Sequence, residues 1–250
     1  MAWDDEDLMD GPVSKWHQIA ERLRSALAKG EFAPGDALPS ETVLTRRFGI
    51  SRTTARSALN ELENEQLVTR RSGQGTIVLP PKVEQPLNLL ASFADDMRAR
   101  GLRPGYRLNG VTVQPAPAEV ARELGVEEGA RTVCVDRVLL ADDEPIASSV
   151  SWLAARIADP AAPPGEDALR DTSLYEWIER TTGTRISSGR EYIDGGVADA
   201  QLAKSLEIAK GAPILIARRR ALSAAGDPLE YVTITYRADR YRFRIELARP

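Results

Sequence analysis

The sequence holds one cysteine, one histidine and no long apolar run, and each shortage excludes a class of protein. Cys134 has no second cysteine with which to form an internal disulfide. Cys134 and His17 cannot build the usual zinc sites, and a Ser-His-Asp or Cys-His nucleophile would depend on His17 alone. Because His17 lies in an amphipathic stretch, we interpret it as a surface or packing residue. We therefore expect no catalytic residues, no metal and no cofactor.

The chain also lacks a secretory signal and any apolar segment of membrane-spanning length, which favours a soluble, cytoplasmic protein with no membrane partner. Its 250 residues are 42% hydrophobic and 28% charged, enough for one large domain or two smaller ones. The net charge of −4 is unevenly distributed, because acids crowd residues 4–10. We expect residues 1–11 to be disordered, and the mildly basic residues that follow are compatible with a nucleic-acid partner.

Residues 12–80 begin with three short amphipathic stretches. Apolar residues recur at helical spacing from Trp16 to Leu27. Ser40 is placed to cap a second helix, and Ser51 is placed to cap a third. The last two stretches are joined by a tight turn that contains glycine, which is a helix-turn-helix pattern.

The third stretch carries polar residues on the face opposite its apolar stripe. Arg52, Thr53 and Arg56 lie near its start, where a recognition helix presents side chains to base edges in the major groove. Two β-rich stretches follow, and the glycine-containing turn between them holds Arg70 and Arg71, which can reach phosphates or a minor groove. A charged surface helix and an ordinary hairpin are the alternative, which the order of the features disfavours.

Residues 38–78 resemble the DNA-binding domain of GntR-family regulators almost throughout. The resemblance implies a winged helix-turn-helix whose recognition helix and hairpin wing contact double-stranded DNA, the wing in the minor groove. The candidate DNA-binding residues are Ser40, Glu41, Ser51, Arg52, Thr53, Thr54, Arg56, Arg70, Arg71, Ser72, Gly73 and Gly75. The family commonly has an arginine at the position of Thr42, and from this departure we hypothesise an altered operator preference.

Prolines at positions 80, 81 and 86 predict a domain boundary near Pro80 and an extended linker over residues 81–91. Beyond the linker, residues 92–250 repeat themselves at a spacing of roughly 82 residues, so that Gly129-Ala130 aligns with Gly211-Ala212. Each copy reads as helix, strand, short helix, strand, turn, strand. Two such copies predict an α+β domain with one mostly antiparallel sheet of six strands, helices on one side, and a ligand cleft between the copies.

This second segment resembles the UTRA effector-binding domain of the HutC-like subfamily, which shares the fold of chorismate lyase. The matching pieces include Ser92-Phe93, the strand around Arg137, Ser173-Leu174-Tyr175, and Glu230-Tyr231 with the DRY-type ending that follows. The resemblance implies a small-molecule effector and dimerisation through this domain. The candidate effector-binding residues are Ser92, Phe93, Arg137, Ser173, Glu230 and Tyr236.

Several of these candidates allow a purely structural interpretation. Ser92 and Ser173 each begin a helix, so they are either simple N-caps or two helix ends that bind an anion. Arg137 lies in an apolar strand and points either to solvent or into the cleft, and the resemblance favours the cleft. Relatives that sense sugar phosphates have a second arginine at the position of Leu139, so Leu139 disfavours a phosphorylated sugar.

We therefore expect a multidomain α+β protein that is no enzyme: a ligand-responsive transcription regulator, most simply a repressor. It would bind a pseudo-palindromic operator as a homodimer and be released or repositioned by a small polar or anionic metabolite. One alternative is a constitutive DNA-binding regulator with a degenerate sensor. Another is an enzyme of chorismate-lyase-like fold, against which stands the lack of any visible cluster of acid, base and nucleophile.

Overall fold

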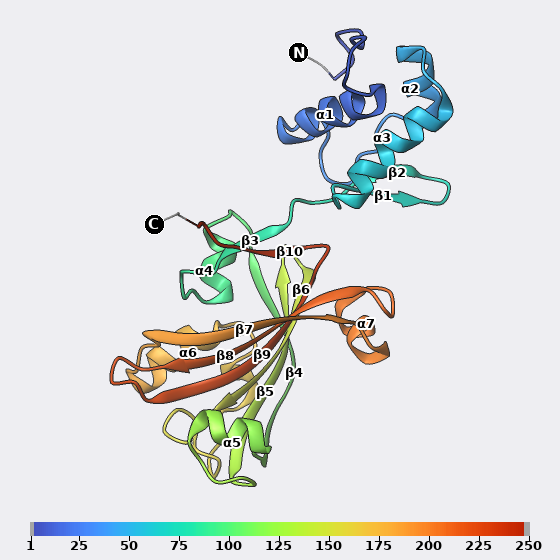
Figure 1. The fold of residues 1–250 in the computed structure, drawn as a ribbon. Helices are drawn as coiled ribbons and strands as arrows, with labels where there is room; N and C mark the ends of the chain where they lie inside the picture. Colours follow the sequence, from blue (N-terminus) through green and yellow to red (C-terminus); the bar gives the residue numbers. More distant parts are fainter. Residues whose placement is uncertain (1–2, 248–250) are drawn as a thin grey trace. The chain divides into compact units, whose positions relative to one another are not determined.

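The computed structural model describes residues 3–247 and divides into two compact units, Met1–Lys82 and Val83–Pro250 (Figure 1). The division follows Lys82, close to the proline at which the sequence predicts a boundary. Directly after it, β3 (Val83–Pro86) pairs in parallel with β10 (Tyr241–Arg244). Part of the segment that we expected to be a linker is therefore a strand of the second unit.

The first unit consists of α1 (Lys15–Ala28), α2 (Glu41–Phe48), α3 (Arg52–Asn64), β1 (Val68–Arg71) and β2 (Gly75–Val78). The caps form as the sequence predicts, because the side chains of Ser40 and Ser51 accept hydrogen bonds from the backbone N–H groups of Val43 and Thr54. α2 ends at Gly49, whose φ of +62° lies in the left-handed region that glycine adopts without strain. The unit is a winged helix-turn-helix.

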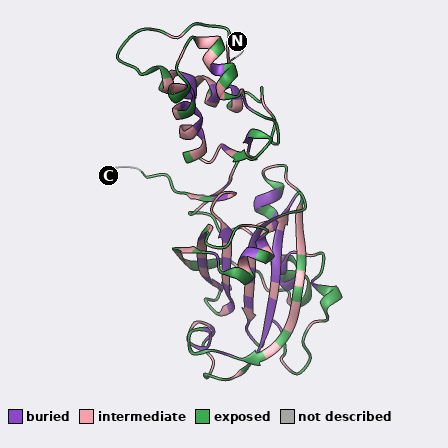
Figure 2. Ribbon diagram, turned by 90° about the vertical axis from the view of Figure 1, so that its right-hand side faces the viewer, coloured by how far each residue is buried: buried purple, intermediate pink, exposed green. Residues whose placement is uncertain are grey.

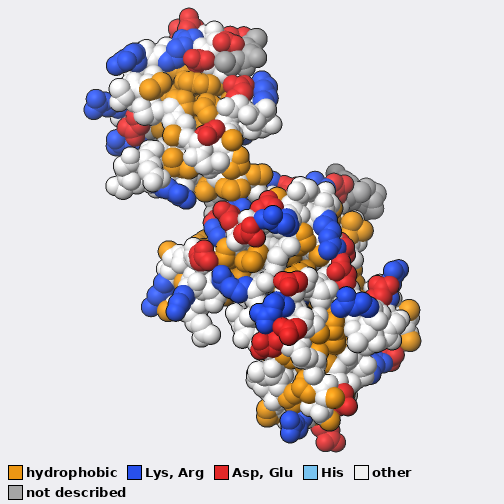
Figure 3. All heavy atoms as spheres, turned by 180° about the vertical axis from the view of Figure 1, so that it is seen from behind, with side chains coloured by type: hydrophobic (Ala, Val, Ile, Leu, Met, Phe, Trp, Pro, Cys, Tyr) orange, Lys and Arg blue, Asp and Glu red, His pale blue; other side chains and the backbone are white. Residues whose placement is uncertain are grey.

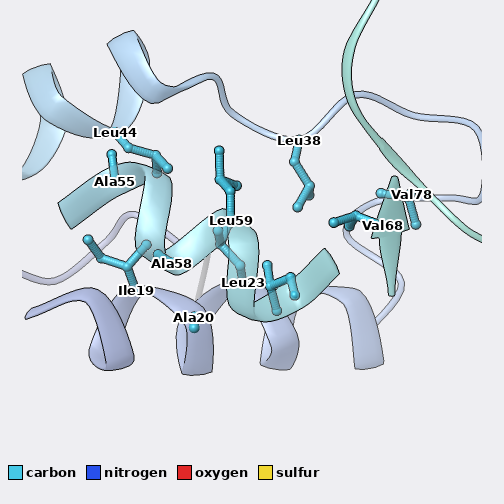
Figure 4. Close-up of a cluster of buried hydrophobic side chains, with 11 residues drawn as sticks. Ile19, Ala20, Leu23, Leu38, Leu44, Ala55, Ala58, Leu59, Val68 and Val78 are labelled. Atoms are coloured by element: carbon cyan, nitrogen blue, oxygen red, sulfur yellow. The ribbon is translucent and has the colours of Figure 1, made fainter. Parts of the chain in front are cut away.

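The core of this unit fills the space between α1, α3 and the hairpin (Figure 4). Ile19 and Leu23 project from α1 toward Leu59 of α3, and Val78 of the hairpin joins the same cluster. Leu44, which is fully buried, ties α2 to it. The apolar residues of α3, the third predicted stretch, thus pack in the core, and the polar face of α3 points outward.

Residues 3–10, which we expected to be disordered, lie against α1 and α2. Trp3 and Leu8 pack on the edge of the core. Arg47 donates a hydrogen bond of 2.9 Å to the carbonyl of Asp4. The expectation rested on the acids of this segment and overlooked the apolar side chains among them, whose burial favours docking.

The second unit is built around one antiparallel sheet with the strand order β4-β5-β6-β9-β8-β7 (Figure 1). Its first half contains α4 (Phe93–Arg98), β4 (Pro104–Pro115), α5 (Ala118–Leu124), β5 (Arg131–Ala141) and β6 (Glu144–Leu153). Its second half contains α6 (Leu174–Thr182), β7 (Ser188–Val197), α7 (Ala200–Leu206), β8 (Pro213–Leu222) and β9 (Pro228–Arg237), after a short 3-10 turn, Glu166–Ala168. Both halves have the element order of the sequence repeat, and the α+β architecture is the expected one.

Helices cover both faces of this sheet, and the expectation of helices on one side is wrong. Met97 of α4 and Trp177 of α6 pack on one face, whereas α5 contacts Tyr231 and α7 contacts Ile214 on the other. The reason is visible along the strands in Figure 2, where residues of both faces are buried. A sheet that is apolar on both sides needs cover on both sides.

Candidate functional site

The start of α3 presents polar side chains to solvent. Arg52 and Thr53 are exposed, and Arg56 lies one turn further along the same helix. The Arg56 guanidinium is held by the carboxylate of Glu41 in α2, with Nε–Oε1 at 2.8 Å and Nη2–Oε2 at 3.1 Å. This contact lowers the pKa of Glu41 and fixes Arg56 in one orientation. The role of Glu41 at this surface is therefore to orient the Arg56 side chain.

The remaining candidates on the two helices, Ser40, Ser51 and Thr54, take part in capping the helix starts. Ser40 and Ser51 are the N-caps already described, and the Ser51 hydroxyl lies 2.9 Å from the Thr54 hydroxyl. Both serines are exposed at helix starts, where free N–H groups and the helix dipole also favour a phosphate. The exposed Thr42 lies in the same first turn of α2.

The hairpin wing projects an exposed tip between β1 and β2. Gly73 and Gly75 have φ values of +77° and +90°, which a larger residue would adopt only with strain. Ser72 and Arg71 are exposed beside them. Arg70, in contrast, is turned back to α3, where its backbone N–H donates to Glu63 at 3.0 Å and its guanidinium contacts the same carboxylate. Of the two wing arginines, Arg71 is exposed and forms no ion pair within residues 3–247.

A cavity lies on one face of the sheet in the second unit, beneath α4 and α6. Its empty space is about 390 Å³, with some open solvent at its mouth. The pairing register places Arg137 beside Ser149, and Ser151 beside Val232 and then Arg219, on the same face of the sheet. The cavity is lined by Ser92, Phe93, Tyr106, Arg137, Leu139, Ser149, Ser151, Ser173, Leu174, Tyr175, Arg219, Glu230, Val232 and Ile234.

Arg137 is the first charged group of this cavity. It is 4% exposed, and its Nη1 donates a hydrogen bond of 3.0 Å to the carbonyl of Thr172, while its Cζ lies 4.8 Å from the ring centre of Tyr106. Within residues 3–247, no carboxylate oxygen lies within 4.0 Å of its guanidinium. Burial lowers the pKa of Arg137. Arg137 is thus a buried cation in no direct ion pair, and the charge of Glu230 in the same cavity offsets only part of the effect of burial on its pKa.

Glu230 is the buried carboxylate of the same cavity. It is 2% exposed, and its Oε2 has no hydrogen-bond partner among the described residues. Burial raises the pKa of Glu230, while the Ser151 hydroxyl and the charges of Arg219 and Arg137 lower it by less. An orphaned carboxylate oxygen in a cavity can accept a hydrogen bond from a ligand.

The two helix starts differ in their capping. Ser92 does cap α4, since its hydroxyl accepts from the Asp95 N–H at 3.1 Å and donates to the Asp95 carboxylate at 2.7 Å. Ser173 precedes α6 and makes no capping hydrogen bond with its side chain. The N-cap interpretation is therefore right for Ser92. Ser173 does not cap its helix through its side chain, and it lines the cavity.

The two remaining candidates, Phe93 and Tyr236, differ in whether they line the cavity. Phe93 lines the cavity. Tyr236 does not line the cavity: it lies further along β9 on the same face of the sheet, 2% exposed and stacked on Tyr241 with ring centres 4.0 Å apart. Leu139, where a second arginine would stand in sugar-phosphate sensors, supplies an apolar stretch of the lining.

Sequence reasoning missed Arg219 in β8. Arg219 is 4% exposed, with its Nε and Nη2 3.0 and 2.9 Å from Glu191 Oε1 and its Nη1 3.2 Å from the Tyr175 hydroxyl. The repeat could have found it, because the offset that aligns Gly129 with Gly211 also aligns Arg137 with Arg219. The two arginines thus occupy equivalent places in the two halves of the sheet.

Comparisons with known proteins match both units. The model of bacterial regulatory proteins of the gntR family matches residues 15–78, and the UTRA domain model matches residues 99–242. Within residues 3–247, no helix is long and apolar enough to cross a membrane, and no group of histidine, cysteine and acidic residues is arranged to hold a metal.

Two of the similar proteins are named transcriptional repressors. The chain is 37% identical to the HTH-type transcriptional repressor NagR of Bacillus subtilis, over 93% of this chain and 94% of the relative. It is 28% identical to the mannosyl-D-glycerate transport/metabolism system repressor MngR of Escherichia coli, over 92% and 94%. The structure of PhnF from Mycobacterium smegmatis superposes with a TM-score of 0.64 and 28% identity, over 92% of this chain and 99% of PhnF.

Proposed function

Because the chain belongs to the gntR family of bacterial regulatory proteins and carries a UTRA domain, it is a transcription regulator, and we propose that it represses its targets as a homodimer on a pseudo-palindromic operator. In this proposal residues 12–80 are the DNA-binding domain, residues 81–91 the connection, and residues 92–250 the effector-binding and dimerisation domain. A small polar or anionic metabolite in the cavity releases the protein from its operator or repositions it.

The DNA-reading surface consists of the start of α3 and the tip of the wing. Arg52, Thr53 and Arg56 read base edges in the major groove, and Arg71 lies on a phosphate or in the minor groove. The exposure of these side chains supports this assignment. Each chain has a single α3, so two copies related by a twofold axis match two half-sites about one helical turn apart.

The effector part of the proposal depends on one observation, the buried Arg137, with which no carboxylate of residues 3–247 forms a direct ion pair. A buried cation without a partner is costly, and a bound anion would offset that cost. The name of MngR supports the same chemistry, since mannosyl-D-glycerate is an anionic sugar derivative. A ligand that favours one arrangement of the dimer shifts the DNA-binding equilibrium by its difference in affinity between the two states.

The test is a selection of genomic DNA fragments with the purified full-length protein, followed by footprinting with and without pooled cell metabolites. We expect an inverted repeat to be protected and the protection to be lost or shifted with metabolites. Arg52→Ala should abolish protection, whereas Arg137→Gln should keep protection and lose the response. Protection that no metabolite pool alters, in the native protein and in Arg137→Gln alike, would favour the constitutive regulator.

A further inference from the structure

The cavity contains two equivalent arginines, of which only one is neutralised. Arg219 is paired across the strands with Glu191, and their side chains form an ion pair at 2.9 Å. Arg137 is paired across the strands with Leu108, which offers no charge. The two halves of the sheet thus carry an arginine at equivalent positions, and only Arg219 has an acidic residue opposite it. Arg137 is the cation that remains available.

Three charged side chains line the cavity: Arg137, Arg219 and Glu230. Since Glu191 neutralises Arg219, one unpaired cation and one unpaired carboxylate remain in a cavity whose walls are otherwise apolar or hydroxylated. On the face shown in Figure 3, in contrast, charged side chains of both signs lie close together. Inside the cavity, water screens these two charges less than it screens charges on the surface.

Arg137 and Glu230 form no direct ion pair, although the charge of each favours the ionised form of the other. No nitrogen of Arg137 lies within 4.0 Å of the Glu230 carboxylate. Arg137 pairs with Ser149 of β6, which pairs with Ile234 of β9, so Glu230 lies two strands away and four residues along β9. The two side chains thus reach the cavity from separate places, and a ligand between them can contact both.

Resting on the function proposed above, we propose that the effector is a small zwitterion, whose anionic group binds Arg137 and whose ammonium group binds Glu230. The charge balance argues for this class over its neighbours. A phosphate dianion without an amine would place a second negative charge beside Glu230, and a plain amine would face Arg137. The hydroxyl of Ser149, which is paired across the strands with Arg137, can complete the hydrogen bonds of either an anionic carboxylate or a phosphate.

The experiment measures thermal stabilisation of the full-length protein by matched probes at one concentration. The zwitterions are γ-aminobutyrate and O-phosphoethanolamine, which separate a carboxylate from a phosphate ligand. Butyrate and ethyl phosphate lack the amine, and ethanolamine lacks the acid. We expect one zwitterion to raise the melting temperature while its matched acid and amine do not. Stabilisation by the amine-free acids that equals that of the zwitterions would overturn the proposal.

A second measurement decides the matter if none of these probes binds. The metabolite pool that releases the operator is treated with acetic anhydride, which acylates amines, and the release is measured again. Loss of the releasing activity supports the zwitterion, and full retention overturns it. Release by the untreated pool reports on the proposed function, and its sensitivity to acylation reports on this inference, so the two can fail separately.

Charge-neutral variants locate the two ends of the ligand. Glu230→Gln should weaken binding of the active zwitterion, or its releasing potency, by about tenfold to hundredfold, and should not weaken binding of the amine-free acid, which is relieved of the repulsion by Glu230. Arg137→Gln should weaken both, and Arg137→Lys should restore part of the loss. The exposed Glu127→Gln is the matched control and should change nothing. Equal losses for the zwitterion and the acid in Glu230→Gln would contradict the assignment of the ammonium group.

Discussion

Replacing Glu230 by glutamine should stabilise the protein in the absence of ligand. When the carboxyl group of Glu230 is ionised, it is 2% exposed with one oxygen that has no partner within residues 3–247, so folding leaves a desolvated group unsatisfied. Such a group costs about 1–3 kcal/mol. A unit of the size of Val83–Pro250 gains roughly 2–4 °C in melting temperature per kcal/mol. Glu230→Gln should therefore melt about 2–12 °C above the native protein at pH 8.

The direction of the pH dependence follows from the raised pKa of Glu230. A carboxyl group whose pKa is higher in the folded state favours folding while it is protonated, and this contribution is lost as pH rises through the folded-state pKa. The difference in melting temperature should thus be small near pH 4.5 and grow toward pH 8. Circular dichroism melts across this range measure it, with Glu127→Gln as the control. A variant that melts no higher than the native protein at pH 8 would refute the reasoning.

Three further predictions concern other parts of the chain. Leu59→Ala should destabilise the first unit by about 2–5 kcal/mol, because Leu59 is 2% exposed in its core, and an unchanged first transition in thermal unfolding would contradict this. Arg56→Ala should weaken binding to the selected operator by about 5- to 150-fold, and Glu41→Gln by less, as read by fluorescence anisotropy; equal affinities of all three proteins would remove α3 from base reading. Burial raises the pKa of Cys134 to about 11, so its thiol should react with a disulfide reagent at pH 8 only after unfolding, and prompt reaction of the native protein would be the contrary result.

The helices and wing of the first unit could be predicted from sequence because their signals are local. Ser51 caps α3 through a hydrogen bond to a residue three positions away, and the apolar stripe of α3 shows in its spacing alone. The pairing of Arg56 with Glu41 could not be foreseen in the same way. It joins two helices whose relative placement depends on the whole core.

The residues that line the cavity could not be predicted from the alternation of side chains along a strand alone. The sequence identifies β6 as a serine-rich strand, but only the register of the sheet puts Ser149 and Ser151 in the cavity and turns Ser148, paired with Val138, to the opposite face. A one-residue change of register exchanges the two faces of a strand, and β6 meets β5 with an irregularity at Leu139. Tertiary pairing therefore decides which polar residues reach a ligand.

Leu108→Glu tests whether the missing counter-ion is what makes Arg137 a receptor for anions. The substitution copies into the first half of the sheet the arrangement of the second half, where Glu191 faces Arg219. The new carboxylate would neutralise Arg137, and an incoming anion would have to displace it, so the effector concentration needed for operator release should rise by about tenfold or more. Leu108→Gln is the matched control, similar in size and polarity but without charge, and should respond far more like the native protein. Operator affinity without effector, measured by anisotropy, should be the same for all three proteins, because the substitution lies outside the DNA-binding unit. If Leu108→Glu and Leu108→Gln release the operator at the same effector concentration, the charge at this position is irrelevant, and the unpaired state of Arg137 does not explain effector binding.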